Sequence, residues 1–187
     1  MRSETDIIQA IASGKERALA MLYERYSEKV YNTALSYTKN AEDAEEITQD
    51  VFVKIFRKAA TFEGKSSLTT WIYRIVVNTS LTYVKKRNRF SFFTSPPKPS
   101  ESIDFVHPGV LLENKENAFA LYKAMDCLPD SQKTAFILSF IEELPRQKVA
   151  DIMKVSLKAV ESLLQRAKKN MRSELEKVYP HRRNPKN

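Results

Sequence analysis

Basic and small hydroxyl side chains gather in one stretch, TFEGKSSLTTWIYRIVVNTSLTYVKKRNR, which covers residues 61–89. Gly64, Ser66 and Ser67 come first, an apolar-periodic segment follows, and the stretch ends in a run of lysines and arginines. Cations pair with phosphates and aromatic rings stack on unpaired bases, so such a surface suits single-stranded nucleic acid. An ordinary core helix with a solvated basic end would give the same pattern. The stretch alone leaves both interpretations open.

A second stretch suited to nucleic acid is PRQKVADIMKVSLKAVESLLQRAKKNMR, residues 145–172. Its spacing predicts a short helix, a tight turn near Lys154, and a second helix with Ser156 as its N-cap. The inward stripe of the second helix is expected at Val160, Leu164, Ala167 and Met171. This is helix-turn-helix patterning, in which the second helix enters the major groove of duplex DNA. A helical hairpin with a charged exterior is the alternative, and the usual turn glycine is missing.

Residues 41–60 predict a helix whose first half is strongly acidic. The five acids within nine residues are Glu42, Asp43, Glu45, Glu46 and Asp50. The helix dipole favours acids at this end, and a solvated face is the usual explanation for such a charge run. The chain as a whole carries a net charge of +8, however, and Phe52, Val53 and Phe56 are expected on the same exposed face. A protein partner with basic, apolar helices would explain both observations.

Charge and hydropathy restrict the class of protein. A pI near 9.5 predicts attraction to polyanions, either nucleic acid or an anionic membrane surface. No run approaches the roughly twenty apolar residues of a membrane span, and the N-terminus lacks an apolar core of signal-peptide length. A cytoplasmic protein without direct membrane insertion is therefore expected.

The sequence offers little to support catalysis or metal binding. Cys127 is the only cysteine, which excludes an internal disulfide, and its apolar neighbours predict a place in the core. No glycine-rich phosphate loop, metal cluster or nucleophile motif occurs, and His107 and His181 lie apart in the linker and the tail. We therefore expect no enzyme activity, no cofactor and no metal site.

Helical periodicity and only three glycines predict an all-α chain of two small domains joined by a Pro/Ser-rich linker. The domains are expected at 1–89 and 116–180, with the linker at 90–115 and a basic tail at 181–187. Helices are expected at 4–13, 15–38, 41–60, within 61–89, and at 116–128, 130–142, 145–154 and 156–179. The apolar face of the second helix includes Tyr23, whereas Thr70 and Tyr73 are expected off the buried face of the fourth.

In this order, the segments resemble the extracytoplasmic-function (ECF) sigma factors, the small two-domain class of bacterial transcription initiation factors. The resemblance extends from about Lys15 to about Glu176, and its most specific parts are the stretches 40–87 and 128–172. It implies a sigma2-like four-helix domain that binds core RNA polymerase and melts the minus-ten element. It also implies a sigma4-like helix-turn-helix domain that reads the minus-thirty-five element. A helix-turn-helix regulator that acts without core polymerase is the alternative function.

The resemblance also implies roles for individual residues. Those that match the helix bound by the clamp of the beta-prime subunit are Asp43, Glu46, Gln49, Asp50, Phe52, Val53 and Phe56. Those that match the minus-ten reader, whose loop captures a flipped base, are Gly64, Lys65, Ser66, Ser67, Trp71, Arg74, Asn78, Lys85, Lys86 and Arg87. Those that match the minus-thirty-five recognition helix are Ser156, Lys158, Glu161, Ser162, Gln165, Arg166 and Lys169.

The partners implied by the resemblance are core RNA polymerase, through the beta-prime clamp helices and the beta flap, promoter DNA, and an anti-sigma factor. The linker matches the segment that threads through the polymerase in this family. Two positions depart from the family pattern: Leu163 stands where an arginine is common, and Pro145 replaces a small capping residue. These departures concern the minus-thirty-five sequence rather than the fold.

Overall fold

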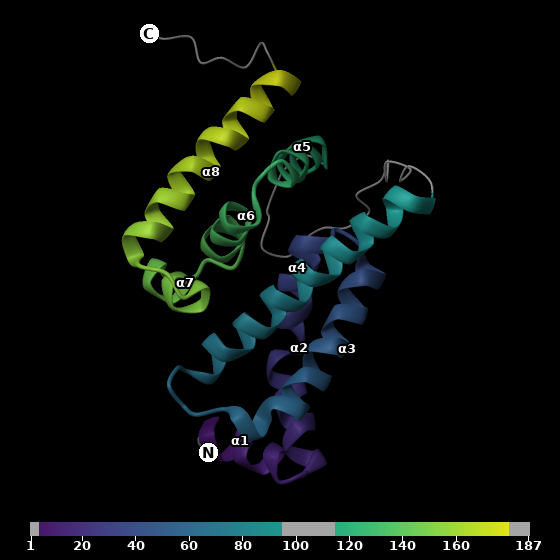
Figure 1. The fold of residues 1–187 in the computed structure, drawn as a ribbon, viewed down its shortest axis with the longest axis vertical. Coiled ribbons are helices and arrows are strands. Elements are labelled where there is room, and N and C mark those ends of the chain that lie inside the picture. The colour runs from purple at the N-terminus through teal and green to yellow at the C-terminus, as the bar shows by residue number, and fades with distance from the viewer. Residues whose placement is uncertain (1–3, 95–114, 180–187) are drawn as a thin grey trace. The chain divides into compact units, whose positions relative to one another are not determined.

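The structure is a computed structural model that describes residues 4–94 and 115–179 (Figure 1). The chain divides into two compact units, Met1–His107 and Pro108–Asn187. Every element in the described residues is a helix, which confirms the predicted all-α, two-domain fold. None of the described helices is long and apolar enough to cross a membrane. Most of the predicted linker and the predicted basic tail, with His107 and His181, lie outside the described residues.

The first unit is built around three long helices that pack side by side (Figure 1). Its elements are α1 (Glu4–Ala12), α2 (Glu16–Thr38), α3 (Ala41–Lys58), the short 3-10 helix η1 (Ala59–Thr61) and α4 (Leu68–Thr94). α1 packs across the start of α2 and against η1, with its isoleucines Ile7, Ile8 and Ile11 buried. This arrangement places α1 beside the loop 62–67 that connects η1 to α4.

The connection between α2 and α3 is tight because local chemistry ends one helix and begins the next. Lys39 adopts a left-handed conformation (φ 57°), and its N–H donates to the Leu35 carbonyl, which closes α2. The Asn40 side chain then accepts a hydrogen bond of 2.8 Å from the Asp43 N–H and caps α3. The two helices are thus held antiparallel, and the acidic start of α3 lies next to the end of α2.

The second unit contains the predicted helix-turn-helix. Its elements are α5 (Lys115–Asp126), α6 (Asp130–Phe136), a π-helical turn (Ile137–Ile141), α7 (Arg146–Met153) and α8 (Leu157–Val178). α8 packs on α5, α6 and α7 through the predicted inward stripe, all of which is buried: Val160, Leu164, Ala167 and Met171. A hydrogen bond of 2.9 Å from Asn170 to Gln132 also joins α8 to α6.

The turn of the helix-turn-helix forms without glycine. Lys154 takes the left-handed conformation (φ 56°, ψ 43°) that a glycine would adopt without cost, and its N–H donates to the carbonyls of Ala150 and Asp151. Ser156 then caps α8, with its Oγ accepting from the Ala159 N–H at 3.2 Å. The missing glycine therefore changes the stability of the turn but not its geometry.

Some expected boundaries differ from those in the structure. α4 continues to Thr94, five residues into the segment expected to be linker. The helix expected at 130–142 is an α-helix followed by a π-helical turn. The prediction that Cys127 is in the core was wrong, because α5 ends at Asp126 and Cys127 lies exposed in the turn that follows.

Three burial predictions were also wrong, because periodicity does not say how many neighbours cover a helix. Thr70 and Tyr73 are buried, since α4 is packed by both α2 and α3 rather than on one face. Tyr23 is 47% exposed, although its ring packs against that of Phe52 across α2 and α3.

The left-handed Lys154 generates a stability prediction. A residue with a side chain loses roughly 1 to 2 kcal/mol of stability in this conformation relative to a favoured one. Glycine avoids that cost, but its greater conformational freedom in the unfolded state cancels part of the gain. Lys154→Gly should therefore raise the free energy of unfolding by about 1 kcal/mol in chemical denaturation. Lys154→Ala, which removes the same charge but keeps the Cβ, is the matched control and should give no such gain. Equal stability of the two variants would contradict this explanation of the turn.

Candidate functional site

An apolar groove of about 660 Å³ runs between α2 and α3. The residues lining it are Glu16, Leu19, Ala20, Tyr23 and Glu24 from α2, and Phe52, Val53 and Phe56 from α3. Val53 and Phe56 are 46% and 44% exposed, whereas Phe52 is only 6% exposed. The prediction that Phe52 is exposed was therefore wrong. Its ring lies 4.7 Å from that of Tyr23, and it forms part of the groove wall rather than a projecting contact.

The acidic and apolar residues of α3 lie along one exposed stripe. Glu46, Gln49, Val53 and Phe56 are three or four residues apart, a spacing that places side chains on one face of a helix. All four are exposed, as is Asp50 on the adjoining turn. Exposed apolar side chains of this size beside a groove mark interaction surfaces more often than solvated faces. The structure thus joins the predicted core-binding residues, apart from Asp43, into one continuous surface.

Asp43 instead belongs to a polar cluster that ties α3 to α4, together with Glu46, Tyr83 and Arg87. The Tyr83 hydroxyl lies 2.7 Å from Asp43 Oδ1 and 3.0 Å from Glu46 Oε2. Arg87 forms an ion pair with Asp43, and its Nη1 lies 3.5 Å from the Thr38 carbonyl at the end of α2. Sequence analysis had assigned the two acids to polymerase and Arg87 to DNA. In the structure Arg87 pairs with Asp43, and both acids accept hydrogen bonds from Tyr83.

The cluster also changes the acidity of Tyr83. Burial, followed by hydrogen bonding to Asp43 and Glu46, raises the pKa of Tyr83 well above its ordinary value of 10.0. The neutral phenol is the form that can donate to a carboxylate, so the folded protein favours it. The hydrogen bonds from Tyr83 to the two carboxylates are therefore present at neutral pH.

The loop 62–67 supplies the small, open surface that precedes α4. Gly64 has a φ of +67°, and no atom lies within 4 Å of the position its Cβ would take, so the backbone rather than crowding requires glycine there. Lys65 is exposed and pairs with Glu63 at 2.5 Å. Phe62 packs against Trp71, with ring centroids 5.2 Å apart, which fixes the base of the loop to α4.

The hydroxyl groups of the loop differ in availability. Ser67 caps α4: its Oγ accepts from the Thr70 N–H at 3.2 Å and lies 2.9 Å from the Thr70 hydroxyl. Ser66 is half-buried and precedes the cap. The prediction that both serines contact unpaired bases therefore fits Ser66 better than Ser67, whose hydroxyl is already bonded.

The predicted minus-ten residues of α4 follow one line from the loop to the basic end of the helix. Trp71, Arg74, Asn78 and Lys85 are separated by three, four and seven residues, which keeps them on one face. Asn78, Lys85 and Lys86 are exposed, and Trp71 and Arg74 are half-buried. The structure therefore brings the loop and these side chains into one polar strip.

The predicted minus-thirty-five residues lie on the outer side of α8. Lys158, Glu161, Gln165, Arg166 and Lys169 are exposed, and Ser162 is half-buried. The hydroxyl of Ser156 is used as the helix cap, and Arg166 Nε donates to the Ser162 carbonyl at 3.2 Å. In the part of the chain that the structure describes, no group of acids, histidines and cysteines could hold a metal ion.

Comparison with known proteins identifies both units. The family described as Sigma-70 region 2 matches residues 22–90, and the family described as Sigma-70, region 4 matches residues 118–171. RNA polymerase sigma factor SigV of Bacillus subtilis (strain 168) is 30% identical over 152 residues, which are 81% of this chain and 87% of that protein. The chain belongs to the ECF sigma factors of the sigma-70 family.

Other relatives agree with this membership. The ECF RNA polymerase sigma-E factor of Escherichia coli (strain K12) is 27% identical over 175 residues, 87% of this chain and 88% of that protein. The solved structure of the sigma factor RpoE with the anti-sigma factor NepR from Bartonella quintana has the same fold, with a TM-score of 0.59 and 21% identity. The matched residues make up 88% of this chain and 98% of the RpoE chain.

As an ECF sigma factor, the chain binds core RNA polymerase and directs promoter-specific transcription initiation. The two family matches do not favour the alternative function, a helix-turn-helix regulator acting without polymerase. The relatives are sigma factors, which are not enzymes.

Three exposed apolar residues of this sigma factor, Tyr23, Val155 and Leu157, were not predicted to be exposed. Tyr23 of the groove was assigned to a buried stripe, although its position one residue after the buried Leu22 offered a hint that it faces elsewhere. Val155 and Leu157 flank the Ser156 cap and are 39% and 40% exposed. Their signal was available, since neither belongs to the inward stripe of α8.

The Tyr83 cluster generates a pH prediction. Because the folded-state pKa of Tyr83 is raised, its contribution to stability is complete below about pH 10 and is lost as the pH rises toward the folded value. Tyr83→Phe should cost about 1 kcal/mol of unfolding free energy at neutral pH through the lost hydrogen bonds. It should also flatten the fall in stability above about pH 10.

Chemical denaturation at a series of pH values measures both effects. Some alkaline loss should remain in the variant, because burial also raises the pKa of Tyr26 and raises that of Tyr122 to about 12. Identical alkaline slopes for the wild-type protein and Tyr83→Phe would show that the cluster does not hold the neutral phenol.

Proposed function

We propose that this sigma factor initiates transcription through three separate surfaces: a polymerase-binding face on α3, a minus-ten reader formed by the loop 62–67 with α4, and a minus-thirty-five reader on α8. The observation that carries the proposal is the stripe of acidic and apolar side chains on α3, whose charge is opposite to that of the basic strip of α4. A surface of that composition suits a protein rather than DNA, because carboxylates repel phosphates.

The polymerase-binding face is proposed to receive the clamp helices of the beta-prime subunit. Val53 and Phe56 project from α3 into an open groove with Phe52 in its wall, and Glu46, Gln49 and Asp50 continue the stripe toward the start of the helix. Apolar anchors surrounded by charges are typical of binding hot spots. A partner helix with apolar residues and basic flanks would complement this face, and Asp43 would act on it only after leaving its ion pair with Arg87.

The minus-ten reader is proposed to hold unpaired bases of the non-template strand. Gly64 leaves open space in the loop, Lys65 and Ser66 lie beside it, and Asn78 is exposed on the strip of α4. Lys85 and Lys86 supply phosphate contacts farther along the helix. The other predicted residues, Ser67, Trp71 and Arg87, mainly hold the loop and α4 in place, because each side chain already contacts another residue of the protein.

The minus-thirty-five reader is proposed to place the first turns of α8 in the major groove. Glu161, Gln165 and Arg166 present the residue types that read cytosine, adenine and guanine edges, respectively. Lys158 and Lys169 supply phosphate contacts, and Ser156 holds the start of the helix. The beta flap of polymerase is proposed as a further partner of this domain.

The remaining assignments follow from the same proposal. The domains are proposed at 1–89 and 116–180 with a linker that threads through polymerase, and the chain is proposed to act in the cytoplasm without catalytic activity or cofactor. An anti-sigma factor is proposed as a regulatory partner, supported by the related RpoE, which was solved in complex with the anti-sigma factor NepR.

The polymerase-binding face is tested by removing its exposed apolar side chains. Val53→Ala with Phe56→Ala should weaken association with core polymerase at least tenfold, because both side chains would be buried in the complex. Titration of fluorescently labelled protein with core polymerase measures the affinity. Phe52→Ala is a poor test, since truncating a buried phenylalanine costs about 3 to 5 kcal/mol of folding stability.

Met21→Ala is the matched control, because it removes an equally exposed apolar side chain of the same unit that does not line the groove. It should leave polymerase affinity unchanged. If the Val53 and Phe56 variant binds core polymerase as the wild-type protein does, while thermal unfolding confirms that both are folded, α3 is not the polymerase-binding face.

A further inference from the structure

We propose that a hollow between α1 and α2 is a second binding site for single-stranded DNA, which takes a nucleotide next to those held by the loop 62–67. The inference rests on the proposed minus-ten function and extends it to residues that the sequence did not single out. The site would bind a phosphate through its cations and the flat face of a base on its apolar floor.

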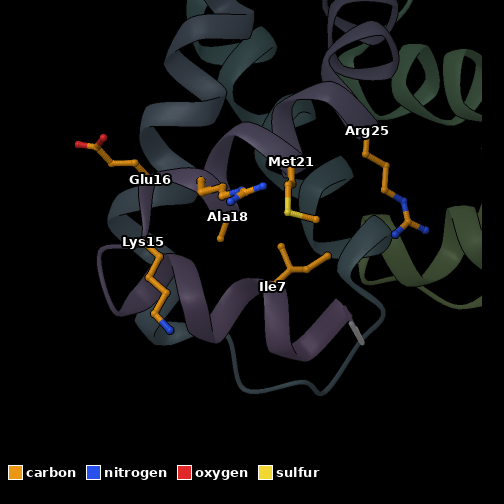
Figure 2. A pocket seen from close by; sticks show the side chains of 7 residues that line it. Ile7, Lys15, Glu16, Ala18, Met21 and Arg25 are labelled. Atoms are coloured by element: carbon orange, nitrogen blue, oxygen red, sulfur yellow. The ribbon is translucent and has the colours of Figure 1, made fainter. Parts of the chain in front are cut away.

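The hollow is large enough for a nucleotide and combines the two chemistries that one needs. Its volume is about 790 Å³, and the residues lining it are Ile7, Lys15, Glu16, Arg17, Ala18, Met21 and Arg25. Figure 2 shows Ile7 of α1 directed toward Met21 of α2, with Ala18 beside them. Ile7 and Ala18 are buried, but Met21 is 44% exposed. A polarisable thioether on an apolar floor suits the face of an aromatic ring.

The charge of the lining favours an anion. Lys15, Arg17 and Arg25 are exposed, and Glu16 is the one acid among the seven lining residues. In Figure 2 the Glu16 carboxylate points away from the hollow. Three cations beside a short apolar floor match a phosphodiester linked to a base.

The hollow adjoins the proposed minus-ten reader on two sides. Arg25 lies 3.8 Å from Glu4 and 5.6 Å from the centre of the Tyr26 ring. The Tyr26 hydroxyl in turn lies 3.2 Å from Thr69 Oγ1, at the start of α4. On the other side, α1 packs against η1, which leads directly into the loop 62–67. A strand held by the loop can therefore continue into the hollow.

The two faces of α2 differ in the partner they suit. The charged residues of the groove shared with α3 are the acids Glu16 and Glu24, whereas those of the hollow shared with α1 are three cations and Glu16. An acidic peptide would satisfy the charge of the hollow as well as DNA does. Continuity with the base-capturing loop favours the nucleic acid.

The test uses full-length protein assembled with core polymerase and single-stranded minus-ten oligonucleotides. One oligonucleotide carries the minus-ten element alone, and two others extend it by about four nucleotides at the 5′ or the 3′ end. The wild-type protein should gain affinity from one of the extensions. Lys15→Ala combined with Arg17→Ala should lower the affinity for that extended oligonucleotide about tenfold. The same variant should leave the affinity for the short oligonucleotide unchanged.

Two further measurements distinguish a site from general attraction. The slope of log affinity against log salt concentration for the extended oligonucleotide should fall by about 0.7 for each lost phosphate contact. Met21→Ala should reduce the gain without changing this slope, because it alters the floor and not the charge. Lys123→Ala with Arg172→Ala is the matched control, since it also removes two exposed positive charges, but from the other unit.

Each result that would contradict the proposed DNA site has a different meaning. Equal affinities of the wild-type and the Lys15 and Arg17 variant for the extended oligonucleotides would overturn the inference. So would an equal loss for short and extended oligonucleotides, which indicates general phosphate attraction. Unchanged DNA binding with lost binding of an acidic amphipathic peptide would assign the hollow to a protein. If the wild-type complex shows no preference for the minus-ten sequence, the proposed function fails and this inference fails with it.

Discussion

The contact of Asp43 with Tyr83 and Arg87 is the interaction on which the basic half of α4 depends. The core of the first unit covers α4 only as far as Ser80, and beyond that residue its described side chains are half-buried or exposed. Apolar burial therefore fixes the first half of the helix but not the second. A phenol and a guanidinium bonded to one carboxylate supply the attachment that the core does not, and they direct Lys85 and Lys86 along a defined line.

The same contact links two proposed surfaces that must be used together. Glu46 stands at the start of the polymerase-binding stripe and shares the Tyr83 hydroxyl with Asp43, and Arg87 stands at the end of the minus-ten strip. A partner that engages Asp43 would release Arg87 for DNA, whereas in the free protein the acid occupies the cation that a phosphate would bind. Coupling of this kind needs no large movement, because a single ion pair changes partners.

Periodicity predicted the helices and the inward stripe of α8, because apolar residues on one buried face of a helix recur every three or four positions. It did not predict that α4 has neighbours on two sides, which buries Tyr73, or that α2 leaves Tyr23 uncovered. The bond between Tyr83 and Asp43 joins residues 40 apart in the sequence, and it depends on how α3 packs on α4. The exposed Cys127 depends on a helix ending two residues earlier than expected. The family resemblance predicted the fold and the function, but only the packing shows which assigned residues are already engaged.

Run-off transcription with core polymerase on a randomised promoter library tests the central claim most directly, that this chain directs promoter-specific initiation through two DNA-reading surfaces. The account predicts transcripts that begin at a fixed distance from one shared minus-ten sequence and one shared minus-thirty-five sequence. It also predicts that Arg166→Ala relaxes the preference at a single minus-thirty-five position by about 1 to 3 kcal/mol. Transcripts without shared elements, or none above core polymerase alone, would contradict it.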